Sequence, residues 1–193
     1  IFVLFASECP EKKCYAYFGD NFEKKEVVWE DRSGCMSIVP FEKREGEFLA
    51  INEFDLKANP STAKLVWGKR VAGKWITKDV ISLPFLHRFD IYHIEGKDYF
   101  IGATIAEKKE CKNDWTKPGH IYIGEIGESP IQEIRLKRIE GSYFKNHGYT
   151  RGNMNGLVCG YFASDDGIIR VTPSKDINNW KIEKILDGNF SEI

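Results

Sequence analysis

Short apolar runs alternate with polar, glycine-containing breaks along almost the whole chain. The clearest example is an apolar run at 88–94, a break at Glu95-Gly96, and a second run at 98–105 that is apolar almost throughout. Two such runs joined by a two-residue turn containing glycine are typical of a β-hairpin. No stretch shows the sustained 3.6-residue apolar period, with capping residues, that marks an amphipathic helix. The pattern therefore predicts an all-β protein with little helix.

The expected strands fall into four successive groups. They lie at 1–7, 14–19 and 24–30; at 35–41, 46–54, 63–69 and 74–82; at 88–94, 98–105, 120–126 and 131–139; and at 149–153 (a weak pattern), 156–163, 168–172 and 180–186. Corresponding strands recur roughly every fifty residues, which is the length of one four-stranded propeller blade. The longest interval contains the polar insertion 108–117. We therefore expect a β-propeller; a β-sandwich with accidental spacing is the alternative.

The predicted blades do not begin and end with the chain. Their parts are 1–33, 34–85, 86–145 and 146–190, with the start of a further blade at 191–193. The chain starts without methionine on what reads as a second strand, and it stops where a new first strand would start. We expect a partial ring, completed by a missing remainder of the propeller or by a partner chain. Pairing of the two ends in a four-bladed ring is the alternative.

Composition narrows the function classes. The chain has 193 residues, 42% of them hydrophobic, which is enough for a sizeable core. The 28 basic and 29 acidic residues give no electrostatic footprint for nucleic acid. No apolar run has the length of a membrane span, and no signal peptide is visible. We therefore expect a cytoplasmic protein that binds neither nucleic acid nor membrane.

The five cysteines, Cys9, Cys14, Cys35, Cys111 and Cys159, are too scattered for a disulfide framework. We expect reduced thiols, although Cys9 and Cys14 flank a turn and pairing across that hairpin is the alternative. A zinc site needs a second closely spaced pair of ligands, and the sequence has none. We therefore expect no metal site, and the sequence identifies no cofactor.

Candidate chemistry gathers in the segments that lead into the innermost strands. In a propeller these segments share one face with the loops between second and third strands, where ligands commonly bind. They contain one set of basic, acidic and aromatic residues: Arg32, His87, Arg88, Asp90, His147, Tyr149 and Arg151. His87 and His147 hold equivalent places in successive blades. Such a set can bind an anion or a sugar acid, hold a metal, or transfer protons.

Two roles are open for this set. In the first, His87, Asp90 and His147 are catalytic candidates and the arginines and Tyr149 bind the ligand. In the second, the histidines are hydrogen-bonded spacers between blades and Asp90 accepts hydrogen bonds from backbone amides. The insertion adds Asp114 and Trp115 as ligand-binding candidates. Trp115 suits stacking on a sugar ring, or it folds back as a cover on its blade.

Two segments resemble a known family. His87–Ile91 (HRFDI) with 96–102 (GKDYFIG) resembles the repeat of FG-GAP/VCBS-type propellers, in which an aspartate-rich calcium loop joins the first two strands. His147-Gly148, with 156–160 (GLVCG) and 164–168 (SDDGI), is similar to the propeller domain of aldos-2-ulose dehydratase-like and uncharacterised bacterial proteins. Lys97 stands inside the loop that would carry the calcium aspartates, so calcium coordination is not expected. The resemblance implies a sugar-related ligand on the propeller face, near His87, Asp90 and His147.

Three functions follow from these observations. The first is a propeller that binds a small sugar-derived or anionic ligand, with lyase- or isomerase-type chemistry as an extension. The second is a non-catalytic protein-interaction propeller. The third is a glycoside hydrolase in which Asp90 works with Asp114 or Glu53. No nucleophile elbow, phosphate-binding loop, dinucleotide fingerprint or His-Glu-x-x-His motif is present.

Overall fold

The computed structural model describes residues 2–7, 11–55 and 62–191 of the chain. These residues form four antiparallel sheets and one short 3₁₀-helix, η1 (Ile177–Asn179). The first sheet contains β1 (Phe2–Ala6), β2 (Cys14–Phe18) and β3 (Lys24–Trp29). The second contains β4 (Ser37–Pro40), β5 (Glu47–Asn52), β6 (Lys64–Val71) and β7 (Lys74–Ser82). The prediction of an all-β chain with little helix is confirmed.

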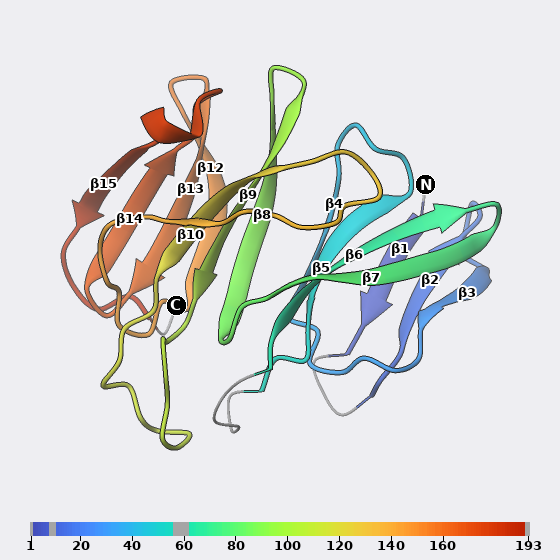
Figure 1. Ribbon diagram of the computed structural model, residues 1–193, viewed down its shortest axis with the longest axis horizontal. Coiled ribbons are helices and arrows are strands. Elements are labelled where there is room, and N and C mark those ends of the chain that lie inside the picture. Colours follow the sequence, from blue (N-terminus) through green and yellow to red (C-terminus); the bar gives the residue numbers. More distant parts are fainter. Residues whose placement is uncertain (1, 8–10, 56–61, 192–193) are drawn as a thin grey trace.

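The other two sheets have the same plan. The third contains β8 (Leu86–Ile94), β9 (Lys97–Thr104), β10 (Ile121–Ile126) and β11 (Lys137–Arg138). The fourth contains β12 (Gly148–Met154), β13 (Leu157–Ser164), β14 (Gly167–Thr172) and β15 (Lys181–Leu186). In every sheet the strands pair in chain order, as a simple meander. The sheets follow one another across the molecule, from β1–β3 on the right of Figure 1 to β12–β15 on the left. They form the blades of a partial propeller.

The hydrophobic core lies in layers between successive sheets. β5 is buried along its whole length because it contributes to two layers at once. Phe48 and Ala50 pack against the first sheet, whereas Leu49 and Ile51 pack toward the third. Alternate side chains of a strand point to opposite faces, so a strand covered on both sides has no polar face. A third layer joins the third and fourth sheets.

The connections between blades repeat in detail. Each segment that leaves an outermost strand donates a backbone N–H to a carbonyl near the start of the third strand of its own blade. The donors and acceptors are Arg32 to Lys12 (3.3 Å), Leu83 to Ala63 (3.1 Å), Tyr143 to Gly119 (3.0 Å) and Phe190 to Ser164 (2.9 Å). Successive pairs recur roughly every fifty residues, with the longest interval at the insertion 108–117, so the interval expected from the sequence is a structural repeat.

Two expectations about secondary structure are wrong. Of the strand predicted over 131–139, only Lys137–Arg138 pairs with β10. Ile131 and Ile134 instead bury their side chains in the layer between the second and third sheets, so the segment passes over Gly124 of β10 without pairing along its edge. The sequence also predicts His87 ahead of the first strand of its blade. β8 begins at Leu86, with a register shift before Arg88, so the candidate residues lie within the strand itself.

Some expectations fall on residues outside the described ones. Cys9 is among them, and so are 192–193 of the expected further blade. The four described cysteines, Cys14, Cys35, Cys111 and Cys159, are free thiols. Burial raises the pKa of Cys14 and of Cys35 to about 12, so both thiols stay protonated. None of the helical structure in the described part of the chain is long or apolar enough to cross a membrane.

Candidate functional site

The structure brings His87 and His147 together where the innermost strands β8 and β12 begin, which we call the inner end of the third and fourth sheets. Their ring centroids are 4.6 Å apart and the rings are stacked, with an angle of 28° between their planes. Two residues before His87, Phe85 has a φ of 62° and turns the chain sharply into β8. The Phe54 ring lies 5.2 Å from the His87 ring. The two histidines therefore converge from separate blades, as their equivalent sequence positions indicate.

His87 is neutral in the folded protein. Its side chain is almost fully buried, with 3% exposure. This burial, together with the nearby Arg88 and His147, lowers the pKa of His87 to about 3. At neutral pH one ring nitrogen of His87 carries a proton and the other is an acceptor. Nδ1 has no hydrogen-bond partner among the described residues.

Further buried polar groups without partners in the described structure lie close in sequence to His147 and to Phe54. Asn146 directly precedes His147, and Asn52 ends β5 two residues before Phe54. Both side chains are buried, with 1% and 0% exposure. In each, neither the amide nitrogen nor the amide oxygen has a hydrogen-bond partner in the described structure. We refer to Asn52, His87, Asn146 and His147 as the inner-end cluster.

The insertion after β9 closes over a neighbouring apolar patch, at the lower end of Figure 1. Trp115 and Phe54 pack against Phe85 and its buried neighbours Ile105 and Ala106. Nζ of Lys109 lies 3.1 Å from the centroid of the Trp115 ring and has no hydrogen-bond partner among the residues that the structure describes. Burial lowers the pKa of this lysine. One face of Trp115 is thus taken by Lys109, and the ring packs on the Phe85 cluster.

Asp114 holds the insertion in shape. Its carboxylate accepts hydrogen bonds from the backbone N–H of Glu110 (2.9 Å) and of Thr116 (3.0 Å), and from the Thr116 hydroxyl (2.7 Å). These donors lower the pKa of Asp114 to about 2. Each of its oxygens is used within the loop, so the role that the structure gives Asp114 is local.

Asp90 faces the fourth sheet. It accepts hydrogen bonds from Nε (2.8 Å) and Nη2 (2.7 Å) of Arg151 and from the Tyr149 hydroxyl (2.7 Å). Arg151 also donates to the carbonyl of Ile91 (2.6 Å), and the hydroxyls of Tyr149 and Tyr92 are 2.9 Å apart. The hydrogen bonds with Asp90 raise the pKa of Arg151, and burial raises the pKa of Tyr149. This network joins the two inner strands β8 and β12.

The remaining arginines also join sheets. Arg88 donates to the carbonyl of Met36 (3.0 Å), which connects β8 to the segment entering β4. Arg32 pairs with Asp79, connecting the segment after the first sheet to β7. The predicted site residues therefore divide: the histidines meet in one place, whereas Asp90, Arg88, Arg151 and Arg32 hold neighbouring sheets together.

Sequence reasoning missed three of the residues in this region. Asn146 has a visible signal, because it precedes a histidine that holds a repeated place in the chain. Asn52 interrupts the apolar run 48–51, and a polar residue closing a fully buried strand marks a special environment. Lys109 has no such signal, since it stands in a run of charged residues that is typical of an exposed loop.

No family model matches the chain, and no curated protein matches it. The likeness to FG-GAP/VCBS-type propellers stays a prediction. Within the described residues, no group of three or more histidine, cysteine, aspartate or glutamate side chains is placed to hold a metal ion.

Proposed function

We propose that the inner-end cluster binds a small polyhydroxy ligand of the sugar or sugar-acid class. One observation carries this proposal: Asn52, His87 and Asn146 bury five polar atoms that have no partner in the described structure. Folded proteins satisfy the large majority of their buried polar groups. Each unsatisfied group costs about 1–3 kcal/mol. Such groups, on His87 itself and on residues close in sequence to His147 and Phe54, support a binding site whose partner atoms come from a ligand.

The chemistry of the cluster supports a ligand with hydroxyl groups. Each asparagine side chain has a donor and an acceptor, and so does a neutral imidazole. A hydroxyl group both donates and accepts, so it can satisfy either kind of atom. The Phe54 ring beside His87 adds an apolar surface of the kind that packs on a sugar ring.

Binding without catalysis is the form of this proposal that the geometry supports. General acid–base catalysis works best when the pKa of the group is close to the working pH, and the pKa of His87 is about 3. Asp90 is occupied by Arg151 and Tyr149. The paired carboxylates of a glycoside hydrolase find no support either. Asp114 is tied to its own loop, and Glu53 is paired with Lys64 at 3.1 Å.

A non-catalytic protein-interaction propeller is the second candidate. It is favoured by the apolar residues that β1 exposes, with Val3 at 46% and Phe5 at 65% exposure. Exposed apolar residues grouped on one element mark interaction surfaces. A cytoplasmic location belongs to the same set of proposals, and the four free thiols are compatible with it.

The proposal is tested by replacing the buried amides with an apolar side chain of similar size. Asn52→Leu and Asn146→Leu should each remove calorimetric binding of glucose and glucuronate. Each should also raise the melting temperature of the ligand-free protein, because a buried unsatisfied amide costs about 1–3 kcal/mol. Asn21→Leu, at an exposed hairpin position, is the matched control and should change neither property.

Two results would contradict the proposal. The first is unchanged affinity for both sugars in both buried-amide variants. The second is absence of binding to the unmodified chain together with a lower melting temperature in both variants, which would show that permanently bound water satisfies the amides.

A further inference from the structure

His87 is placed by two irregularities in the backbone. Phe85, two residues earlier, has a φ of 62°, and a register shift at the start of β8 leaves His87 without a partner residue in β9. The segment entering β12 makes the same turn, since Lys145 stands two residues before His147 and has a φ of 45°. Left-handed backbone is unfavourable for a residue other than glycine, and a bulge redirects a side chain. Both rings are thus placed by departures from regular strand geometry, which are common next to binding sites.

The tautomer of His87 follows from its hydrogen bonds. The ring donates a hydrogen bond to the backbone of His147, whereas Nδ1 has no partner among the described residues. The donating atom is therefore Nε2. Because a neutral imidazole carries only one ring proton, Nδ1 holds a lone pair. His87 thus presents a buried acceptor, and this atom is satisfied only by a group that has a proton to donate.

The described groups around His87 offer little compensation for a negative charge. Its own ring is neutral at neutral pH, and the Phe54 ring beside it is apolar. Arg88, the cation next to it in β8, donates to the carbonyl of Met36 at 3.0 Å. A carboxylate in contact with Nδ1 would set two acceptors against each other and bury a charge without a partner. A hydroxyl group of a neutral sugar would instead donate its proton to Nδ1.

We propose that His87 sets the specificity of the inner-end cluster: its Nδ1 accepts a hydrogen bond from a hydroxyl group of a neutral sugar or polyol and discriminates against a carboxylate in the same place. The role of His87 rests on the proposed function, ligand binding at the inner-end cluster, and narrows it to one ligand class. A site built to hydrogen-bond one group strongly rejects an analogue that lacks this group, because its own buried atom is then left unpaired.

The first test compares glucose with glucuronate by calorimetry on the chain 1–193. Glucose should bind at least about tenfold more tightly. His87→Phe keeps an aromatic ring but has no acceptor, so it should bind glucose at least about tenfold more weakly than the unmodified chain. His87→Asn is the matched control, because its amide oxygen is attached at the same carbon as Nδ1 and can accept in its place. This variant should retain most of the affinity for glucose.

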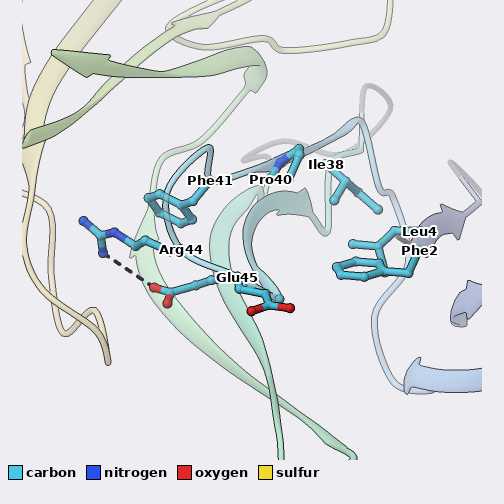
Figure 2. A pocket seen from close by; sticks show the side chains of 9 residues that line it. Phe2, Leu4, Ile38, Pro40, Phe41, Arg44 and Glu45 are labelled. Atoms are coloured by element: carbon cyan, nitrogen blue, oxygen red, sulfur yellow. Dashed lines mark ion pairs between the residues drawn. The ribbon is translucent and has the colours of Figure 1, made fainter. Parts of the chain in front are cut away.

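Glucuronate has a second place where it could meet a cation. Figure 2 shows a pocket of about 400 Å³ between β1 and β4, in which Arg44 lies beside apolar side chains such as Leu4 and Ile38. Binding in this pocket would persist in Asn146→Leu, whereas binding at the inner-end cluster should be lost. Only the affinity that this variant removes therefore enters the comparison of the two sugars.

The second test reads the tautomer directly, by nitrogen NMR of protein with isotope-labelled histidine. In the sugar-free protein Nε2 of His87 should carry the proton, and addition of glucose should move the Nδ1 resonance upfield as this atom accepts a hydrogen bond. His93, near the other end of β8, is the control. Its Nδ1 is already bonded to Asp98 at 2.7 Å, so its resonances should stay where they are.

The possible results distinguish the specificity from ligand binding itself. A proton on Nδ1 of His87, or equal affinity for glucose and glucuronate, would overturn the specificity and leave ligand binding in place. Equal losses in His87→Asn and His87→Phe would overturn it too, since the ring would then act only through packing. Binding of neither sugar would overturn the proposed function and the specificity with it. The tautomer and both affinities are measured on the unmodified chain, so they decide the matter even if a variant fails to fold.

Discussion

His87 and Asp90 lie close together along β8, and they differ in whether their side-chain atoms have hydrogen-bond partners. Asp90 has both carboxylate oxygens engaged, by Arg151, Tyr149 and a backbone amide. His87, three residues earlier, leaves Nδ1 without a partner in the described structure, and the asparagines beside the histidine pair do the same. A satisfied buried network specifies how two sheets pack, whereas an unsatisfied one marks a place for ligand or water. Charged and polar residues from one stretch of chain thus take different roles.

The largest expected effect on stability comes from removing Arg151, the charge partner of Asp90. In Arg151→Met the Asp90 carboxylate, which is 8% exposed, loses its charge partner, and the Tyr92 ring loses the guanidinium that lies over it, while an unbranched side chain is kept. Removing one partner of a buried ion pair costs about 3–5 kcal/mol, and the partial exposure of Arg151 places the loss near the lower limit. Urea unfolding should therefore show about 3 kcal/mol less stability.

The double variant Asp90→Asn with Arg151→Met tests whether the charge is the cause. It removes the uncompensated carboxylate and should recover part of the lost stability. Affinity at the inner-end cluster should be unchanged in every variant that folds. A loss below about 1 kcal/mol in Arg151→Met would show that the network is a weak surface contact.

A smaller loss of stability is expected on acidification, and it comes from His87. The pKa of His87 falls from its ordinary value near 6.5 in the unfolded chain to about 3 in the folded protein. Between these values the unfolded chain binds a proton that the folded protein does not, so stability is complete above pH 6.5 and decreases as the pH falls toward 3. This histidine should contribute a loss of about 2–3 kcal/mol between pH 6.5 and pH 4.

The measurement is the difference in unfolding free energy between the unmodified chain and His87→Gln across this pH range. Subtraction cancels the carboxylates that titrate in both proteins. The charged and titratable groups facing His87 are Arg88 and His147, so His147→Gln is measured alongside. Parallel pH profiles for the unmodified chain and His87→Gln would show that His87 is protonated as readily in the folded protein as in the unfolded one.

Much of the fold follows from sequence patterns that each strand expresses by itself. The apolar runs of β5 and β9 and the Glu95-Gly96 turn indicate strands and a hairpin without reference to any partner. The fifty-residue recurrence then groups these strands into blades. The pattern failed at 131–139, where the apolar residues Ile131 and Ile134 serve a neighbouring sheet. Apolar spacing shows that a residue is buried, and it does not show against which sheet.

The candidate site was less predictable, for a related reason. His87 and His147 hold equivalent places in two blades, so the sequence repeat alone is enough to predict that they approach each other. The partners of Asp90 depend on side-chain directions across two sheets, and Arg151 is sixty-one positions away in the chain. From the sequence alone, a carboxylate such as Asp90 that binds an arginine of the next blade cannot be distinguished from one that binds a ligand.

The smallest expected effect separates the two roles open for Trp115. In Asp114→Ala the backbone amides of Glu110 and Thr116 lose their acceptor. Their hydrogen exchange should become faster, with the melting temperature unchanged, because the bonds lie in an exposed loop. Asp20→Ala, at another exposed turn, should leave both amides protected.

Sugar binding is then measured on the same Asp114→Ala protein. A tryptophan that only covers its blade does not touch the ligand, so loosening its loop should leave the affinity for glucose and glucuronate as it was. A tryptophan that stacks on the ligand would lose its position with the loop, and affinity would fall while the melting temperature stayed the same. Unchanged affinity would confine the ligand site to the inner-end cluster. Reduced affinity would extend the ligand site from His87 across Phe54 to the insertion.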